Sequence, residues 1–442
     1  MSERKSSRHP VFFGWWSVLV TGTISGLGHG FNIYGFSVFF KDLATDLGLN
    51  RAITALAAGI GRLEGGITSP LVGWLSDKFG PRGPVVVGIC ITGTGMILMN
   101  FITEVWHYYV AWGVLIGMGL NIGLTVAVDK AITNWFIRRR GLAQGIKFAL
   151  IGVFTIIVLQ IVNSLVLSQG WRTTCLIWGM VMFVCIPFAF VFVRPQRPEY
   201  YGMLPDGAEI GRGKEEDMGE MIDIGIGYAS SFEETEYSFK QAIRTGTYWL
   251  LFVGFSVHNI IANGVTIHVI PFLTDMGIAR TTASNMMQMM VFFMIPSRFF
   301  GGIIADRVRK NRLKLLLVGT FLLQVIGIST FLLNQNLASV YVWLVCHGLS
   351  SGTVTPVILL ILGRYFGRKA FGSILGSILA FIAPFGLLAP LYCGWVHDTT
   401  GNYINAFITF GALALFSTIT MLFVRAPRPP ADEIGSLTSY TH

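Results

Sequence analysis

The stretch GWLSDKFGPR at residues 73–82 has a counterpart in GIIADRVRKNR at residues 302–312. In each stretch a glycine is followed four positions later by an aspartate, and the aspartate by a lysine or an arginine. The matched residues, each pair 229 positions apart, are Gly73 with Gly302 and Asp77 with Asp306. Two matches at one separation suggest that the chain contains an internal repeat.

A second matched pair supports the repeat. RRRGLAQG at residues 138–145 and RKAFGSILG at residues 368–376 each contain two glycines four positions apart, displaced by 231 positions. The matched residues are Gly141 with Gly372 and Gly145 with Gly376. Coincidence can explain one such match, but two pairs at nearly the same offset indicate a duplicated unit.

The composition is that of a polytopic membrane protein. The 442 residues are 53% hydrophobic and only 12% charged, with a mean hydropathy of +0.63. A soluble domain carries roughly 25% charged residues. Lipid offers the backbone no hydrogen-bond partner, so each apolar run of about 20 residues should be a helix. We expect twelve transmembrane helices, near 13–38, 54–76, 84–102, 106–128, 141–166, 174–193, 247–271, 282–305, 314–333, 338–362, 371–394 and 404–424.

A polar stretch at residues 194–246 divides these twelve helices into six and six. The expected fold is therefore an all-α membrane protein of two pseudo-symmetric six-helix bundles. We expect the bundles at residues 1–193 and 247–424, the cytoplasmic linker between them, and a cytoplasmic tail at 425–442. The Gly- and Glu-rich middle of the linker should be mobile, and its last part should form a short amphipathic helix on the membrane surface.

Basic residues are concentrated in alternate loops. If the N-terminus is cytoplasmic, the outside loops hold only Lys41, Arg51, Arg172 and Arg280. This asymmetry is the positive-inside rule, and it predicts that both termini are cytoplasmic. A basic patch for nucleic acid or anionic lipid explains the net charge of +9 less well. We expect contact with membrane lipid, no nucleic-acid partner and a monomeric chain.

Other functional classes find little support in the sequence. The five cysteines show no disulfide or zinc spacing, so we expect neither a metal nor a cofactor. The chain has no nucleophile elbow or phosphate loop, so we do not expect an enzyme. The segment MSERKSSRHP leads into a span too long for the core of a cleavable signal peptide.

The repeated loop resembles the cytoplasmic signature of the major facilitator superfamily, and the resemblance covers essentially the whole chain. Further stretches are similar to the monocarboxylate transporters and to the oxalate–formate antiporter group. They are FFGWW (12–16), SVFFKDL (37–43), DKFGPR (77–82), WFIRRRGLAQG (135–145) and DTTGNY (398–403). The resemblance implies two six-helix bundles around a midplane site, with access alternating between the two faces of the membrane.

The loop signature also suggests a gate. Asp77 and Asp306 are expected at cytoplasmic helix ends, within reach of Arg82, of the 138–140 cluster and of the basic cluster that begins at Arg307. Ion pairs there would hold the cytoplasmic side closed. The alternative is that the charges only set topology and that Gly73 and Gly302 provide tight packing.

Five ionisable residues fall inside expected spans: Arg62, Glu64, Asp129, Lys147 and Arg298. Each costs ~2.5–3.5 kcal/mol at a helix centre, so each needs a partner or a water-filled cavity. Their charges sum to one net positive charge. A cavity with a surplus cation suits an anionic substrate.

The partners can be partly assigned from depth. Asp129 and Lys147 lie at similar depths on adjacent helices, so a structural pair is one interpretation, and substrate binding by Lys147 is the other. Arg62 and Glu64 point away from each other and should bind separate neighbours. Glu64 and Asp129 are candidates for proton coupling, with Arg62 beside them. Lys130 is close enough to the cytoplasm to extend into water.

Arg298 has no acidic residue within one turn of its own helix or at its level in the second half. Its planar guanidinium suits a carboxylate bidentately and keeps its charge at any cellular pH. The resembling transporters carry an arginine in the same context that binds the substrate carboxylate, and the matching residue here is Arg298. The alternative role is to cap carbonyls around Pro296.

Two helices carry polar stripes at helical spacing. One includes Ser25, His29 and Asn32; the other includes Ser256, Asn259, Asn263 and Thr266. We expect both stripes to face the bundle interior, either lining the substrate site or making interhelical hydrogen bonds. His29 or His258 can carry a proton near neutral pH.

The chain departs from the resembling families at three positions. Tyr34 stands where the animal monocarboxylate transporters have a lysine, and Met294 where they have an acidic residue. Ile378 stands where the oxalate antiporters have a second cation, and the repeat makes Lys147 its counterpart. Either Lys147 is a second anion ligand, or the substrate is a monoanion bound by one cation. These departures also place the animal mechanism of proton coupling in doubt.

The sequence therefore favours a bacterial inner-membrane secondary transporter of a small carboxylate such as lactate or pyruvate, working by proton coupling or anion exchange. Arg298 would bind the anion, with His29, Asn32, Tyr34, Asn259, Asn263 and Lys147 around it. The alternatives are an exporter of an amphiphilic drug-like compound and a membrane receptor or scaffold that transports nothing. The scaffold predicts a partner-binding domain, and the short linker does not supply one.

Overall fold

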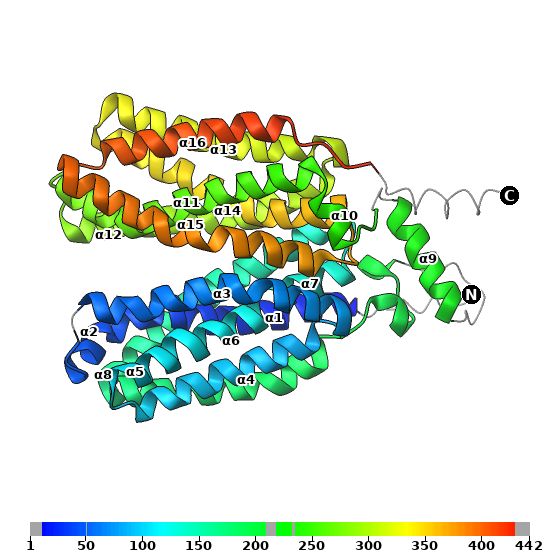
Figure 1. Ribbon diagram of the computed structural model, residues 1–442, viewed down its shortest axis with the longest axis horizontal. Helices are drawn as coiled ribbons and strands as arrows, with labels where there is room; N and C mark the ends of the chain where they lie inside the picture. The colour runs from blue at the N-terminus through cyan, green and yellow to red at the C-terminus, as the bar shows by residue number, and fades with distance from the viewer. Residues whose placement is uncertain (1–10, 50, 209–217, 232–234, 429–442) are drawn as a thin grey trace, which may run out of the picture.

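The computed structural model describes residues 11–49, 51–208, 218–231 and 235–428. It leaves undescribed the side chains of residues 33, 34, 37, 41, 51–59, 62, 280 and 284. The described ranges form helices and connecting turns with no strand, in two halves that lie side by side (Figure 1). The all-helical class expected from the sequence is confirmed.

The N-terminal half contains the elements from α1 to α8. They are α1 (Phe13–His29), the π-helix η1 (Gly30–Gly35), α2 (Phe36–Asp46), α3 (Arg51–Phe79), α4 (Arg82–Leu98), α5 (Val105–Tyr108), the π-helix η3 (Tyr109–Ile116), α6 (Gly117–Asn121), the π-helix η4 (Ile122–Val126), α7 (Ala127–Trp135) and α8 (Arg140–Phe192). Several run on without a break, so α1 to α2 and α5 to α7 are each one continuous helical segment. The π-helical turns interrupt the regular α-helical hydrogen bonding, and such turns are often found at functional sites.

The C-terminal half contains six long helices. They are α11 (Gly246–Asp275), α12 (Arg280–Arg307), α13 (Leu313–Asn334), α14 (Leu337–Phe366), α15 (Phe371–Thr400) and α16 (Ile404–Leu422). Between the halves lie the short helices η5 (Pro198–Tyr201), η6 (Pro205–Gly207), α9 (Met218–Ser231) and α10 (Phe239–Ile243). We call the end of the bundle that carries these short helices, where α1 begins and α16 ends, the linker end (Figure 1).

All twelve ranges expected from the sequence overlap these helical segments. Among the described residues, nine helices are long and apolar enough to cross a membrane. One of them, α8, has the non-helical residue Gly170 (φ 77°, ψ 166°) inside it and so covers two expected spans. The segment 13–46 and helix α3 are not among the nine. Helix α3 carries five charged residues, which lower its hydropathy.

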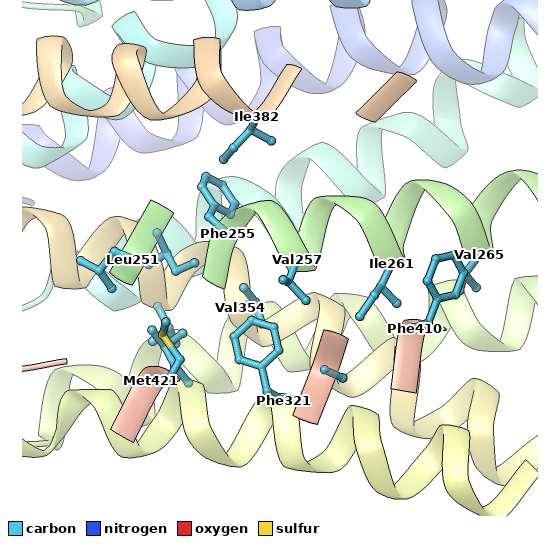
Figure 2. Packing of buried hydrophobic residues seen from close by; sticks show 14 of the residues in the cluster. Leu251, Phe255, Val257, Ile261, Val265, Phe321, Val354, Ile382, Phe410 and Met421 are labelled. Carbon is cyan, nitrogen blue, oxygen red and sulfur yellow. The ribbon is translucent and has the colours of Figure 1, made fainter. Parts of the chain in front are cut away.

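The core of the C-terminal half is continuous and apolar. Figure 2 shows Leu251, Phe255 and Ile261 along α11, with Phe321 of α13 and Met421 of α16 among the residues around them. These five side chains are at most 5% exposed. Because lipid is as apolar as these side chains, their close packing holds the half together mainly by van der Waals contact.

Two helix pairs join the halves: α3 packs on α15, and α8 packs on α12. Small residues allow the close approach. A Cβ at Gly376 would overlap the carbonyl of Ser69, and one at Gly66 would overlap Ala383. Such small-residue contacts are typical of helix packing within membranes.

The Gly- and Glu-rich middle of the linker is partly helical. Its residues 209–217 lie outside the described residues, and residues 218–225 begin helix α9, whose buried face includes Met221 and Ala229 and which packs on η5. The mobility of this stretch stays a prediction. The final part of the linker forms the short helix α10.

Candidate functional site

The carboxylate of Asp77, at the linker end of α3, caps the first turn of α15 in the other half. It accepts hydrogen bonds from the backbone amides of Gly372 (3.0 Å) and Ser373 (2.7 Å), and from the Ser373 hydroxyl (2.7 Å). A negative charge at a helix N-terminus is stabilised by the unpaired amides and by the helix dipole. Asp77 therefore ties the two halves together.

Asp306 makes the same contact in the opposite direction. It lies at the linker end of α12 and accepts hydrogen bonds from the backbone amides of Gly141 and Leu142, both at 2.7 Å, where α8 begins. The internal repeat is thus a structural relationship: each aspartate of the pair holds the helix that follows the repeated basic loop of the other half.

Glycines make these two contacts possible. A Cβ added at Gly73 would overlap the Gly372 carbonyl, and one added at Gly302 would overlap the Gly141 carbonyl. Any larger residue would force the helices apart and lengthen the aspartate hydrogen bonds. The packing role that the sequence offered as an alternative for the glycines therefore accompanies the charge contacts.

The linker adds a second carboxylate to each helix start. Asp206 accepts hydrogen bonds from the amides of Ile137 (3.1 Å), Arg138 (2.8 Å) and Arg139 (3.0 Å), just before α8. Glu236 accepts one from the amide of Lys369 (2.6 Å), just before α15. By the repeat offset, Lys369 is the counterpart of Arg138.

Glu236 is also part of a charge network. Arg197 lies 3.1 Å from its carboxylate, and Glu199 pairs with the buried Arg368 at 2.9 Å. Burial would raise the pKa of Glu236, but the nearby Arg197 and Arg368 charges, with the Lys369 amide, hold it below its ordinary value. Glu236 therefore stays ionised throughout the physiological range.

Seven residues after the start of α8, Lys147 pairs with Asp129 on α7. The two side chains are 3% and 6% exposed, and Lys147 Nζ donates to Asp129 Oδ1. This confirms the structural pair that depth alone suggested. Breaking such a buried pair from one side leaves an uncompensated charge.

The ring of Phe148 lies near both Lys147 and Arg298, a cation of the other half. Lys147 Nζ lies 3.7 Å from the ring centre, and Arg298 Cζ of α12 lies 5.7 Å from it. Both distances are within the range of cation–π attraction. Phe148 packs against the core of the C-terminal half, so this contact crosses the interface.

Glycine again sets the spacing here. A Cβ at Gly145 would lie 2.8 Å from the Arg298 carbonyl, and one at Gly152 would lie 3.2 Å from Ile295 Cγ1. Helices α8 and α12 therefore approach closely over this length. Arg298 is half-buried, two positions after Pro296 inside α12.

Two histidines of the C-terminal half belong to the same region. His258 of α11 lies close enough to Arg298 for their charges to interact. His347 of α14 interacts with His258 and has Nε2 3.3 Å from the Ser351 hydroxyl. Arg298, Lys147 and Asp129 together carry one net positive charge, and the histidines add polar groups that are neutral unless protonated.

Several residues of the two polar stripes hydrogen-bond to their own half. His29 Nδ1 lies 3.0 Å from the Ser25 carbonyl, and buried Ser25 donates to the Leu124 carbonyl at 3.4 Å within its own half. Asn263 donates to the Asn259 carbonyl (2.9 Å) and side-chain oxygen (3.1 Å). Only the Ser25 bond is the interhelical kind that the sequence offered as the alternative, since the His29 and Asn263 bonds each stay within one helix. Substrate contact by the stripes, including half-buried Asn32, stays a prediction.

Three further residues were predicted at the site: Tyr34, Arg62 and Glu64. The side chains of Tyr34 and Arg62 lie outside the described part of the chain. Tyr34 falls in the π-helix η1, where the sequence alone gave no sign of irregular geometry. Glu64 is half-buried, and its carboxylate oxygens have no hydrogen-bond partner among the described residues.

Comparison with known proteins agrees with this geometry. Residues 22–390 match the family model described as Major Facilitator Superfamily. The chain belongs to the major facilitator superfamily. The match spans both halves and the linker.

The chain is also similar to individual transporters over most of its length. The chain is 24% identical to monocarboxylate transporter 12 of Rattus norvegicus, over 88% of this chain and 81% of the relative. It is 26% identical to monocarboxylate transporter 4 of the same species, over 92% and 83%. Among solved structures it resembles the proton:xylose symporter XylE, with a TM-score of 0.71, 13% identity, and 96% and 98% coverage. Both relatives are mammalian, so a bacterial membrane stays a prediction from the sequence.

The ion-pair partner of Asp77 differs from the one expected from the sequence. Lys130, which we had assigned to the water-exposed margin, is 4% exposed and lies 2.7 Å from Asp77. It also donates to the carbonyls of Arg368 and Lys369 in the other half. Lys130 therefore faces the second half of the molecule, and not water as we expected from its position near the end of the span.

Arg82 is not that partner. Its Nε donates to the Val193 carbonyl at 2.7 Å, and its guanidinium stacks over Phe190 at 4.7 Å, both within the N-terminal half. Arg307 is exposed at the end of α12. Among the described contacts, both aspartates bind backbone amides at a helix start, and Asp77 also pairs with Lys130.

Several residues of this transporter fold were missed from the sequence. Phe148 reads as one more apolar residue of a spanning helix, and Asp206 and Glu236 read as ordinary linker charges. The repeat offset was the available signal for the gate, since it marks the loops before α8 and α15 as equivalent. It does not say which carboxylate reaches which loop.

Proposed function

We propose that this protein is a secondary active transporter of a small monocarboxylate, working by alternating access between its two halves. The single observation that carries the substrate class is the placement of Arg298 of one half beside Phe148 of the other, next to a lysine already neutralised by Asp129. A transporter needs its substrate ligand where both halves can reach it.

Arg298 is the residue to which we assign the substrate carboxylate. A guanidinium binds a carboxylate through two parallel hydrogen bonds and cannot lose its charge. Because Asp129 matches the charge of Lys147, the region has one net positive charge, which a monoanion balances and a dianion exceeds. The relatives named monocarboxylate transporters support the same class.

Alternating access requires the contacts at the linker end to break. Asp77 and Asp306 join the two halves at that end, with Lys130 beside Asp77, and these contacts support a gate there. The distribution of basic residues favours a cytoplasmic linker end, with both termini inside. The structure then corresponds to a carrier closed toward the cytoplasm.

Coupling is assigned to the acidic groups of the spanning helices. Glu64 is half-buried within α3, and Asp129 is buried beside Lys147. Substrate on Arg298 is near the Lys147–Asp129 pair, so a proton on Asp129 would change the charge that the substrate meets. Proton symport and anion exchange are both consistent with this arrangement.

The function is tested by counterflow in proteoliposomes. Purified protein is reconstituted with unlabelled lactate or pyruvate inside, and uptake of the labelled compound is compared with uptake of acetate, oxalate and malonate. We expect saturable exchange of monocarboxylates and little exchange of the dicarboxylates. Absence of exchange for every carboxylate would refute the proposed substrate class, and preference for oxalate would assign Lys147 to the substrate.

A further inference from the structure

A groove of about 400 Å³ runs along the outside of the C-terminal half, between α12 and α13. Both helices pack on α14, and Leu349 and Thr353 of α14 form the floor of the groove. Its outer walls include Phe300, Ile304 and Leu315, which are 58%, 51% and 50% exposed. These residues lie on membrane-spanning helices, so the groove opens toward lipid.

The groove offers carbon surface to its occupant. Its hydroxyl groups are used internally: the Ser297 hydroxyl bonds the Leu349 carbonyl and lies 2.6 Å from Thr353 Oγ1, which bonds the same carbonyl at 2.9 Å. An anionic or carbonyl group of a ligand would find no free hydroxyl donor among Ser297 and Thr353. An apolar chain fits the surface without leaving a buried polar group unsatisfied.

Space is available for such a chain. A Cβ built at Gly319, on the α13 wall, would have no atom within 4 Å. This differs from Gly73 and Gly302, where the neighbouring helix fills the space. The groove is therefore a gap in the packing of the half, and lipid is what surrounds it.

Charge marks the linker end of the groove. Arg307 follows the wall residue Ile304 by three positions, and Arg312 precedes the wall residue Leu315 by three. Three residues are about one helical turn, or about 5 Å along an α-helix. Both arginines are exposed, so their guanidinium groups are available at the membrane boundary.

We infer that the groove binds one acyl chain of a phospholipid whose anionic headgroup is held by Arg307 and Arg312. The positive-inside rule alone would explain the two arginines. It does not explain an open apolar groove that ends beside them. Pro296 and Ser297 line the groove and directly precede Arg298, so the bound chain lies against the turn that carries Arg298. The site does not depend on the identity of the transported substrate.

The test compares two lipids that share their acyl chains. Dioleoyl phosphatidylglycerol and dioleoyl phosphatidylcholine are titrated into purified full-length protein in detergent, and the apparent Kd is taken from thermal stabilisation. Each basic residue near the membrane contributes about 1 kcal/mol, or about fivefold in affinity for anionic lipid, so with two arginines we expect phosphatidylglycerol to bind roughly 30-fold more tightly. Inorganic phosphate should not stabilise the protein.

Two variants separate the groove from the charges. Gly319→Phe fills the groove and should weaken phosphatidylglycerol binding at least about tenfold, as expected from loss of several buried methylenes. Arg307→Gln with Arg312→Gln should bring phosphatidylglycerol to the affinity of phosphatidylcholine. Gly83→Phe, at a glycine with equally open surroundings, and Arg425→Gln, an exposed arginine elsewhere at the linker end, are the matched controls.

Equal affinity for the two lipids in the parent protein would overturn the inference, as would stabilisation by inorganic phosphate to the same extent. Unchanged phosphatidylglycerol binding by Gly319→Phe would also overturn it. If Gly319→Phe shows no cooperative unfolding, Gly319→Leu makes the same test with a smaller side chain.

Discussion

The carboxylate of Asp77 accepts a 3.0 Å hydrogen bond from the backbone amide of Gly372, which lies in the other half of the molecule. The equivalent bond joins Asp306 to the amide of Gly141 at 2.7 Å. Each half therefore holds the other by the same chemistry, a carboxylate at a helix N-terminus. We place the gate of the carrier at these two contacts.

Replacing Asp77 by asparagine should open the linker end. The side chain keeps its shape but loses the charge that faces Lys130 and the α15 amides. We expect the closed state to weaken by about 1–3 kcal/mol, roughly 5- to 150-fold in population. Spin labels at positions 78 and 311, both exposed and in opposite halves, should report a longer distance by pulsed electron resonance.

Asp275→Asn is the control for this experiment, since Asp275 pairs with His397 at the opposite end of α11. It should leave the distance between positions 78 and 311 unchanged. A distance distribution in Asp77→Asn identical to that of the parent would show that Asp77 does not hold the gate.

Lys147 and Asp129 should behave as a pair. Lys147→Ala or Asp129→Ala alone leaves a buried charge without its partner, which costs about 3–5 kcal/mol. The double variant removes both charges and should recover part of the lost thermal stability. Simple additivity of the two effects in thermal unfolding would mean that the pair is not coupled.

Glu236 should stabilise the linker only while it is ionised. Its pKa is held below the ordinary value of 4.5, so its contribution is present above that ordinary value and is lost as the pH falls through the lowered pKa. Glu236→Gln should therefore lower the stability by about 1–3 kcal/mol at pH 7, and the difference from the parent should shrink in acid.

Glu220→Gln, on the exposed face of α9, is the matched control and should have little effect at any pH. The measurement is thermal unfolding of the purified parent and both variants from pH 7 to the lowest pH at which the parent stays folded. A difference between Glu236→Gln and the parent that grows toward low pH would contradict the assignment.

The orientation in the membrane can be tested by labelling. In a cysteine-free background, cysteines at positions 48 and 400, at the end opposite the linker, should react with an impermeant maleimide added to intact cells. A cysteine at position 227, an exposed position of α9, should react only after the cells are opened. Labelling at 227 in intact cells would reverse the assigned topology.

Much of the fold followed from the sequence because its causes are local or periodic. Apolar runs fix the helices, and the repeated Gly73 and Gly302 loops mark equivalent positions of the two halves. The repeat could not show that Gly73 meets Gly372 and that Gly302 meets Gly141. Those contacts depend on how two rigid halves dock, which no local pattern records.

The candidate site was foreseen unevenly for the same reason. Asp129 and Lys147 were paired correctly because adjacent antiparallel helices fix their relative depth. Lys130 was misjudged because depth does not tell whether a side chain faces water or the second half. Phe148 and Glu236 were missed because the residues of the C-terminal half that they contact, Arg298 and Lys369, lie more than 100 positions away in the chain.

The central claim is that Arg298 binds the substrate carboxylate, and it is tested most directly by binding to purified protein. Substrate-induced thermal stabilisation is measured for the parent, Arg298→Lys and Arg298→Ala with the carboxylate that the parent exchanges. Loss of a charged partner costs about 2–5 kcal/mol, so Arg298→Ala should lose roughly 30- to 4,000-fold in affinity. Arg298→Lys should retain the charge but bind more weakly than the parent. Binding by Arg298→Ala as tight as that of the parent would contradict the account.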